Sequence, residues 1–336
     1  MDPPETARPF IGIALKVAST VVFTAMATLI KLASDRYPTG ELTFFRSFFA
    51  LIPVLIWVGF RGQFPSVFYT AHIGQHLIRS VGGAAAMFCG FTALALLPIA
   101  DATAIGYAAP LLTVAFAVFL LGEKVHIYRW SAVFVGLFGV IVILSDYVIP
   151  GSSEAGERSV VGAGFAIGGA VFGALAATQV RSLVRYEGAA TIVVYFSLFT
   201  ALFSLATLPF GWSMPDLEEF SLLVLAGIFG GLGQVFLTQS YRFGDASLIA
   251  PFDYTSMLWS LIVSVLVFAA WPTPMVLIGA GIVIGSGLFV ILRERRPAPV
   301  WLLASTSKPS LLIASTNCLP ALGLVLPDSL RVPCRL

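Results

Sequence analysis

Four ionisable side chains fall inside long apolar stretches of this chain: Lys16, Glu41, Arg46 and Asp253. On insertion scales, an Asp, Lys or Arg near the centre of a membrane-spanning helix costs about 2.5–3.5 kcal/mol. A residue placed at such a cost needs a partner, a water-filled cavity or a function. These four positions are therefore the first candidates for chemistry in the sequence.

Asp253 lies eight residues into the apolar run 246–268, shortly after Pro251. A proline frees a backbone carbonyl about one turn earlier, and in a bilayer that group persists only where it faces protein or water. Pro110, after Tyr107, interrupts the corresponding run in the first half of the chain. Helices interrupted at corresponding places indicate a binding site. We predict that Asp253 carries a coupling proton or binds a cationic group; the alternative is a neutral, hydrogen-bonded structural aspartate.

Each of the other three positions has two interpretations. Arg46 lies five residues into the run 41–60, where its guanidinium either binds a carboxylate or phosphate through two hydrogen bonds or braces backbone carbonyls at a helix break. Glu41 opens that run and either caps the helix N-terminus or serves as a second proton-carrying group. Lys16 either meets a buried partner or extends its ammonium to the membrane surface.

Aromatic and amide side chains are candidates to complete a binding pocket around these charges. The predicted contacts with a bound molecule are Tyr107, Gln179, Tyr195, Tyr254 and Trp259, and Gln234 and Gln239 are further candidates. Because aromatic residues make up 13% of the chain, ordinary packing is the alternative interpretation for each aromatic position.

Other kinds of chemistry find little support in the sequence. His72 and His76 have a metal-like spacing but no third ligand nearby, so we expect no metal site. The sequence contains no metalloprotease motif, no Walker ATP-binding motif and no Ser/His/Asp arrangement. Their absence argues against an enzyme and against transport driven by ATP. A net charge of +2 without a basic block excludes nucleic acid as a partner. No cofactor is expected.

The elements that position these residues must be membrane helices. The 336 residues are 58% hydrophobic and 11% charged, with a mean hydropathy of +0.94. Soluble domains carry roughly 25% charged residues, so this chain cannot cover a core with polar surface. Its apolar runs lack period-two alternation and are too long for barrel strands. We therefore expect an all-α integral membrane protein.

Apolar runs of spanning length divide the chain into ten predicted transmembrane helices, five in each half. The first half, 10–144, holds 10–32, 41–60, 74–95, 101–121 and 128–144, and the second, 160–292, holds 160–183, 189–209, 220–241, 246–268 and 273–292. A polar linker, 145–159, joins the halves. The N-terminal tail is 1–9. The proline-punctuated extension 293–336 is expected to be disordered or to lie on a surface, with an eleventh span as the alternative.

Loop charges predict the orientation in the membrane. With ten spans, both termini share one side with the loops after every second helix, and that side collects eleven basic residues: Arg8, Arg61, Arg79, Lys124, Arg129, Arg181, Arg185, Arg242, Arg293, Arg295 and Arg296. The opposite side has only Lys31, Arg36 and Arg158. By the positive-inside rule, both termini are cytoplasmic, which in a bacterial inner membrane also makes the C-terminal extension cytoplasmic.

An internal repeat relates the two halves. The segment 100–105 (ADATAI) is similar to 244–249 (GDASLI), and 45–50 (FRSFFA) is more weakly similar to 195–200 (YFSLFT). Because each half has an odd number of spans, the two copies of the repeat must cross the membrane in opposite directions. Inverted repeats are typical of secondary transporters. The alternative is coincidence among apolar segments of low complexity.

Three segments resemble the EamA type of the drug/metabolite transporter superfamily: 41–55 (ELTFFRSFFALIPVL), 100–125 (ADATAIGYAAPLLTVAFAVFLLGEKV) and 244–268 (GDASLIAPFDYTSMLWSLIVSVLVF). The resemblance covers about residues 10–292. Leu121, Gly122 and Glu123 match the usual end of the fourth helix, where we favour a capping role for Glu123. The second half departs from the pattern. Its corresponding position reads Phe268, Ala269 and Ala270, so the glutamate is missing there.

This resemblance implies a secondary active transporter that moves a small organic metabolite by alternating access, coupled to protons or to another gradient. The family includes importers of riboflavin or S-adenosylmethionine and exporters of amino acids, so the expected solutes are a vitamin, an amino acid or a nucleoside-like compound. An exporter of aromatic amino acids or drugs is the first alternative, and a channel-like facilitator is the alternative class. The expected partners are the solute and membrane lipid, and self-association into a homo-oligomer stays open.

Overall fold

The computed structural model describes residues 9–121, 127–148, 156–183, 186–243 and 250–294, and every regular element in these ranges is helical. The all-α prediction is confirmed for this part of the chain. Several predicted features lie outside the described residues: the cap Glu123, the second repeat motif 244–249, residues 149–155 of the linker and nearly all of the C-terminal extension.

The helices follow the apolar runs closely. The first half contains α1 (Pro9–Ala33), α2 (Thr39–Phe60), the short η1 (Ser66–Phe68), α3 (Ile73–Leu96), α4 (Ile99–Gly106), α5 (Ala108–Leu121) and α6 (Ile127–Val148). The second half contains α7 (Glu157–Leu183), α8 (Ala189–Leu205), η2 (Leu208–Phe210), α9 (Leu217–Phe243), η3 (Ala250–Tyr254), α11 (Thr255–Leu266) and α12 (Pro274–Glu294).

Seven helical stretches in the described residues are long and apolar enough to cross a membrane. One of them runs through α4 and α5 together, over Ile99–Leu120. Three further apolar helices are shorter: Ala189–Leu205, Phe252–Leu266 and Pro274–Val290. The chain is thus a multi-pass membrane protein, as the hydropathy predicts.

Hydroxyl side chains inside the helices donate hydrogen bonds to backbone carbonyls of the preceding turn. The Thr24 hydroxyl donates to the Thr20 carbonyl at 2.9 Å, and the Thr178 hydroxyl donates to the Ala174 carbonyl at 2.8 Å. A bilayer core offers no water to an unpaired polar group, so these bonds back onto the preceding turn let threonine occur in a spanning helix.

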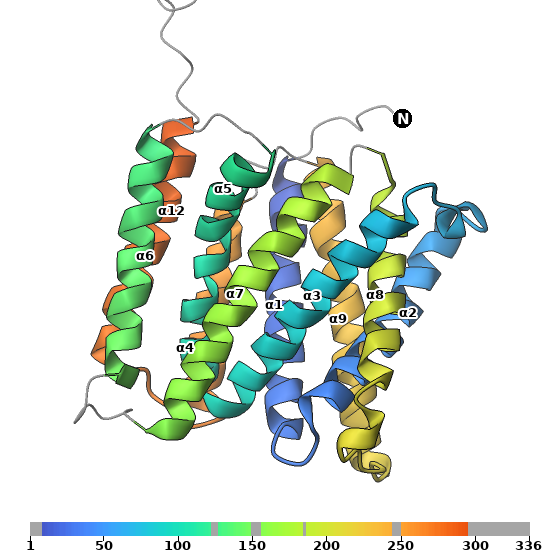
Figure 1. Cartoon of the computed structure of the whole chain (residues 1–336), viewed down its shortest axis with the longest axis horizontal. Helices are drawn as coiled ribbons and strands as arrows, with labels where there is room; N and C mark the ends of the chain where they lie inside the picture. Colours follow the sequence, from blue (N-terminus) through green and yellow to red (C-terminus); the bar gives the residue numbers. More distant parts are fainter. Residues whose placement is uncertain (1–8, 122–126, 149–155, 184–185, 244–249, 295–336) are drawn as a thin grey trace, which may run out of the picture. The chain divides into compact units, whose positions relative to one another are not determined.

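The helices pack in pairs, and most pairs join the two halves of the chain (Figure 1). Helix α3 packs along α7, α1 packs along α9, and α6 packs along α12, while α2 contacts both α8 and α9. Helix α4 contacts α11, and α5 contacts α7. Figure 1 shows α6 and α12 side by side at one edge, with α1, α3, α7 and α9 in the middle.

Both predicted helix interruptions fall where the two halves meet. Tyr107 separates α4 from α5, and Pro110 lies in the first turn of α5, where it has no N–H to donate to the carbonyl of Gly106. In the second half, the backbone of Pro251 and Asp253 lies in the 3₁₀ helix η3, directly before α11. Each interruption gives the chain a short non-α stretch inside a membrane-spanning region.

Glycine lets α6 and α12 approach each other closely. A Cβ atom added to Gly279 would lie 2.5 Å from the carbonyl oxygen of Gly139 and 2.4 Å from Cγ1 of Ile143. A Cβ atom added to Gly139 would lie 2.8 Å from the carbonyl oxygen of Gly279. In lipid, where no hydrophobic driving force acts between helices, close backbone packing of this kind favours their association.

We predict that Gly279→Ala destabilises the protein by about 1–3 kcal/mol, because the added methyl group overpacks the α6–α12 contact. Gly281→Ala on the same helix is the matched control: its Cβ atom would meet nothing within 4 Å. The control should change stability by no more than about 0.5 kcal/mol. Thermal unfolding of both purified variants in detergent measures the difference, and equal unfolding temperatures would contradict the close contact.

Candidate functional site

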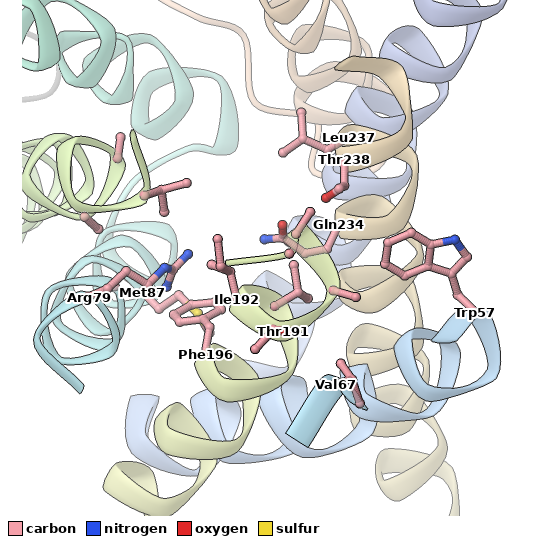
Figure 2. Close-up of a pocket in the computed structure, with 18 of the residues that line it drawn as sticks. Trp57, Val67, Arg79, Met87, Thr191, Ile192, Phe196, Gln234, Leu237 and Thr238 are labelled. Atoms are coloured by element: carbon pink, nitrogen blue, oxygen red, sulfur yellow. The ribbon is translucent and has the colours of Figure 1, made fainter. Parts of the chain in front are cut away.

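A cavity of about 1240 Å³ lies between α1, α2, α3, α7, α8 and α9 and extends to η3. Small-molecule sites usually measure about 300–1,000 Å³, so this one has room for a metabolite together with water. Figure 2 shows Arg79 and Met87 of α3 on one side of the cavity, facing Gln234, Leu237 and Thr238 of α9 on the other.

The cavity opens at the end where α2 finishes and α8 begins. Gln63 and Ser66, after α2, and Gly188 and Ala189, at the start of α8, line this mouth. Three of these four residues are exposed, and Gln63 is partly exposed. Bulk water therefore reaches the cavity from this face of the molecule.

The opposite end is closed by apolar packing. Ile30 of α1, Leu42 of α2, Phe91 of α3 and Leu223 of α9 form one cluster there, and each of these side chains is at most 5% exposed. Four helices that surround the cavity thus converge below it. We call this cluster and the polar contacts beside it the closed end.

Polar contacts reinforce the closed end. The Tyr37 hydroxyl, in the turn between α1 and α2, donates a hydrogen bond to the carboxylate of Glu219 on α9, which also forms an ion pair with Arg36. The Lys31 ammonium donates to the backbone carbonyls of Leu94 and Leu97, at 2.7 and 2.6 Å. These bonds tie the end of α1 to α9 and α3.

The charged residues that line the cavity are Lys16, Arg46, Arg61, Arg79 and Asp253. Four are basic and one is acidic, so the cavity carries a net positive charge. The sequence predicted two of them, Arg46 and Asp253, as site residues, and the structure places both in the lining. A cavity of this sign attracts anions from the face on which it opens.

Lys16 and Asp253 form an ion pair across the cavity wall, with 2.5 Å between Nζ and Oδ1. The Lys16 side chain is 2% exposed and the Asp253 side chain 48% exposed. Lys16 therefore does not extend to the membrane surface; it meets a carboxylate that itself faces water. The pair joins α1 of the first half to η3 of the second.

Arg46 and Arg79 both line the cavity and lie near the Phe196 ring. The guanidinium carbon Cζ of Arg79 lies 3.6 Å from the ring centroid, and that of Arg46 lies 6.0 Å from it. In both arginines the Nε and Nη1 atoms are buried without a hydrogen-bond partner in the described part of the chain. Bracing of backbone carbonyls therefore does not account for these nitrogens.

Two glycines make room for these guanidinium groups. A Cβ atom on Gly83 would lie 2.6 Å from Nη1 of Arg79 and 2.6 Å from Cε2 of Phe196. A Cβ atom on Gly230 would lie 2.9 Å from Nε of Arg46. The space around the arginines thus depends on residues without side chains on α3 and α9.

Three predicted pocket residues form a cluster behind Asp253 rather than in the cavity wall. The Tyr107 hydroxyl lies 2.6 Å from the Ser256 hydroxyl, and the Tyr107 and Tyr254 rings meet edge to face at 5.3 Å. The Trp259 ring N–H donates to the Thr20 hydroxyl at 3.2 Å. These contacts hold α11 against α1, and η3 and α11 against the interruption in the fourth predicted span, and so they position Asp253.

Glu41, Gln179 and Tyr195 also lie outside the cavity lining. The buried Glu41 carboxylate accepts a hydrogen bond from the Ser213 backbone N–H at 3.2 Å, beside the closed end. The Tyr195 hydroxyl donates to the Phe68 carbonyl at 2.7 Å, and its ring stacks on His76. Gln179 is half-buried on α7. Their roles in binding stay predictions.

The histidine pair forms no metal centre in the described residues, where no group of three or more His, Cys, Asp and Glu side chains converges. His76 lies 3.9 Å from the carboxylate of Glu187, which accepts a hydrogen bond from Thr70 at 2.5 Å. These contacts occur near the mouth of the cavity, at the start of α3 and before α8.

Sequence reasoning missed Arg79 as a site residue, because it counted this arginine among the loop charges that set orientation. Helix α3 begins at Ile73, so Arg79 lies almost two turns inside the helix. The signal that could have found it is its position within an apolar run, the same criterion that identified Arg46.

A multi-pass helical bundle with a basic cavity, open at one end and closed at the other, defines the class of membrane transport proteins. The chain belongs to the EamA-like transporter family, which matches residues 10–145 and 160–292. Residues 105–211 also match solute carrier family 35. The resemblance predicted from the sequence is confirmed, and the family consists of transporters rather than enzymes.

Several characterised relatives are similar over most of their length. An S-adenosylmethionine uptake transporter of Rickettsia bellii is 28% identical over 290 residues, which cover 85% of this chain and 95% of the relative. A pseudopaline exporter of Pseudomonas aeruginosa is 30% identical over 253 residues, 74% of this chain and 84% of the relative. A crystal structure with a TM-score of 0.61 and 22% identity covers 85% of this chain and 99% of its own, and so shares the fold.

The asymmetry of the cavity predicts different reactivity of cysteines at its two ends. Ala177 lines the cavity and is exposed, whereas Ala226 belongs to the closed end and is 1% exposed. In a background without Cys89, Cys318 and Cys334, Ala177→Cys should react with a water-soluble maleimide at least about tenfold faster than Ala226→Cys, since only the open state of a site reacts. Equal labelling rates in detergent would contradict the closed end.

Proposed function

We propose that the protein is a secondary active transporter that moves a small organic solute across the inner membrane by alternating access. The observation that carries this proposal is a cavity that is open at one end and closed at the other by contacts between helices from both halves. A channel needs a continuous polar path, and the closed end interrupts any such path here. A carrier needs a binding site that is open to only one side of the membrane at a time.

The packing of the helices supports an architecture of ten spans in two inverted five-helix repeats, 10–144 and 160–292. Exchanging the halves turns the α1–α9 contact into α7–α3, and the α2–α9 contact into α8–α3, and both members of each pair occur. The α5–α7 and α11–α1 contacts are related in the same way. The pairs α2–α8, α6–α12 and α4–α11 map onto themselves. Such pseudo-twofold pairing is what inverted repeats produce.

The loop charges support a cytoplasmic location for both termini and for the mouth of the cavity. Arg61, after the second span, and Gly188, before the seventh, line this mouth. In the ten-span topology both loops lie on the side of the termini, the side rich in basic residues. The structure then represents an inward-facing state, from which an exporter collects its solute and an importer releases it.

We assign the coupling role to Asp253 in its pair with Lys16. Protonation of the Asp253 carboxylate removes its charge and weakens the ion pair with Lys16, which links α1 to η3. Since Asp253 faces the water-filled cavity, protons can reach it in this state. Glu41, the second candidate, lies beside the closed end, away from the cavity. Accepting the hydrogen bond from the Ser213 backbone N–H is a simpler role for this carboxylate than proton coupling.

The solute is proposed to be a vitamin, an amino acid or a nucleoside-like metabolite. The two named relatives transport S-adenosylmethionine and pseudopaline, and they do so in opposite directions. Both names denote organic metabolites of a size that a cavity of about 1240 Å³ accommodates. Export of such a compound is the second candidate function, because the pseudopaline exporter is as similar to this chain as the uptake transporter.

Asp253→Asn should separate coupling from binding. In proteoliposomes, we expect gradient-driven accumulation of the solute to fall at least tenfold, while exchange of internal for external solute continues, because exchange requires no net proton movement. The control is Asp35→Asn, an exposed carboxylate between α1 and α2. Loss of exchange together with accumulation would instead make Asp253 part of the binding site.

Glu219→Gln should weaken the closed end. It replaces the carboxylate that accepts from Tyr37 and pairs with Arg36, and one such hydrogen bond contributes about 0.5–1.5 kcal/mol. Labelling of Ala226→Cys should then rise about two- to tenfold as the outward-open population grows. Glu218→Gln, on the neighbouring exposed residue, should leave the labelling rate unchanged. An unchanged rate in both variants argues against a gate at this place.

A further inference from the structure

We infer that the cluster of Arg46, Phe196 and Arg79 binds an oxyanion of the transported solute, so that the solute is an organic acid. This inference rests on the proposed transport function and specifies its substrate class. The oxyanion can be a carboxylate or a phosphate group, because both accept paired hydrogen bonds from guanidinium.

Arg46 and Arg79 carry charge without an ion-pair partner in the part of the chain that the structure describes. Lys16, by contrast, pairs with Asp253, and Arg36 pairs with Glu219. Arg46 is 3% exposed, and its guanidinium lies near the same Phe196 ring as that of Arg79. Two like charges therefore lie near one ring, an arrangement that an arriving anion would stabilise.

Arg46 and Arg79 also have unused hydrogen-bonding capacity. Nε and Nη1 of both arginines, four nitrogens in all, are buried donors without a partner among the described residues, and both arginines line the cavity. Leaving a buried polar group unpaired is costly, and native structures do so rarely unless a ligand or water completes the bond. A carboxylate or phosphate offers several acceptor lone pairs in a compact group, which matches the unused donors in number and charge.

Aromatic packing positions the Arg79 guanidinium. Its Cζ atom lies 3.6 Å from the centroid of the Phe196 ring, so the ring packs against the guanidinium and leaves its N–H edges to a ligand. Figure 2 shows Arg79 beside Phe196 in the cavity lining. Gly83 and Gly230 leave room for the two guanidinium groups, because a side chain at either position would collide with them.

Binding to the full-length protein in detergent tests the inference with matched acid and neutral probes. The probes are benzoate against benzamide and adenosine monophosphate against adenosine. A third pair is S-adenosylmethionine against its decarboxylated form, which lacks the carboxylate and stays cationic. We expect at least one acid to raise the unfolding temperature and its neutral partner to have no effect. Arg46→Gln and Arg79→Gln should each weaken that acid's apparent affinity tenfold or more.

Arg293→Gln is the matched control. Arg293 stacks on Tyr128 at 5.3 Å and does not line the cavity, so its replacement should leave acid binding unchanged. The unliganded protein supplies a further readout. If the arginines serve a ligand, Arg46→Gln should unfold at the same or a higher temperature than the parent, whereas a structural brace would lower it.

A measurement on the unmutated protein covers the case in which a variant does not fold. Phenylglyoxal modifies accessible guanidinium groups, and mass spectrometry locates the modified residues. Arg79 is only partly buried, so the binding acid should protect it from modification while Arg293 stays reactive. Modification of Arg79 at the same rate with and without the acid would overturn the inference.

The remaining outcomes are equally decisive. Selective binding of the phosphate ester assigns the oxyanion to phosphate, and selective binding of a carboxylate assigns it to carboxylate; both support the inference. Equal binding of acids and neutral partners, or binding of none, overturns it. Transport of a neutral solute that ignores both arginine variants refutes the inference and keeps the proposed transporter. Acid binding without solute flux in proteoliposomes refutes the transporter and keeps the anion site.

Discussion

The cost of placing charge inside an apolar membrane protein governs this structure. Three cations and one carboxylate, Lys16, Arg46, Arg79 and Asp253, lie well inside the spanning helices. In hydrocarbon each would be costly, and together they would prevent the bundle from forming. The cavity resolves this conflict because all four side chains line it. Access of water to the cavity, and the position of the cavity between the two halves, are therefore needed for folding as well as for function.

The remaining architecture divides between elements that hold the cavity in shape and elements that close it. The α6–α12 pair at one edge is joined by direct backbone contact at Gly139 and Gly279 and contributes nothing to the cavity wall. The closed end instead relies on side chains, with Tyr37, Arg36 and Glu219 around a small apolar cluster. Side-chain contacts of this kind exchange more readily than a backbone contact between glycines, so we place the moving parts there.

Hydropathy predicted the helices well because it rests on the thickness of the membrane, which every span must satisfy. It also found Arg46 and Asp253, since a charge in an apolar run stands out in one dimension. It did not find the partner of Lys16 or the role of Arg79, because both depend on which helix faces which. For the same reason Tyr195 and Gln179, equally plausible by residue type, lie outside the cavity lining in the structure. The weak match of 45–50 to 195–200 places Arg46 and Phe196 at equivalent repeat positions, but only the fold brings them together.

Electron–electron distance measurements in lipid nanodiscs test alternating access between the two ends most directly. One spin-label pair would span the mouth, at Ser66 and Gly188, and a second would span the closed end, at Asp35 and Leu217; all four residues are exposed. We predict that a transported acid moves the two distance distributions in opposite directions, with the mouth narrowing as the closed end widens. Movement of both pairs in the same direction, or of neither pair, would contradict a cavity that opens to one side of the membrane at a time.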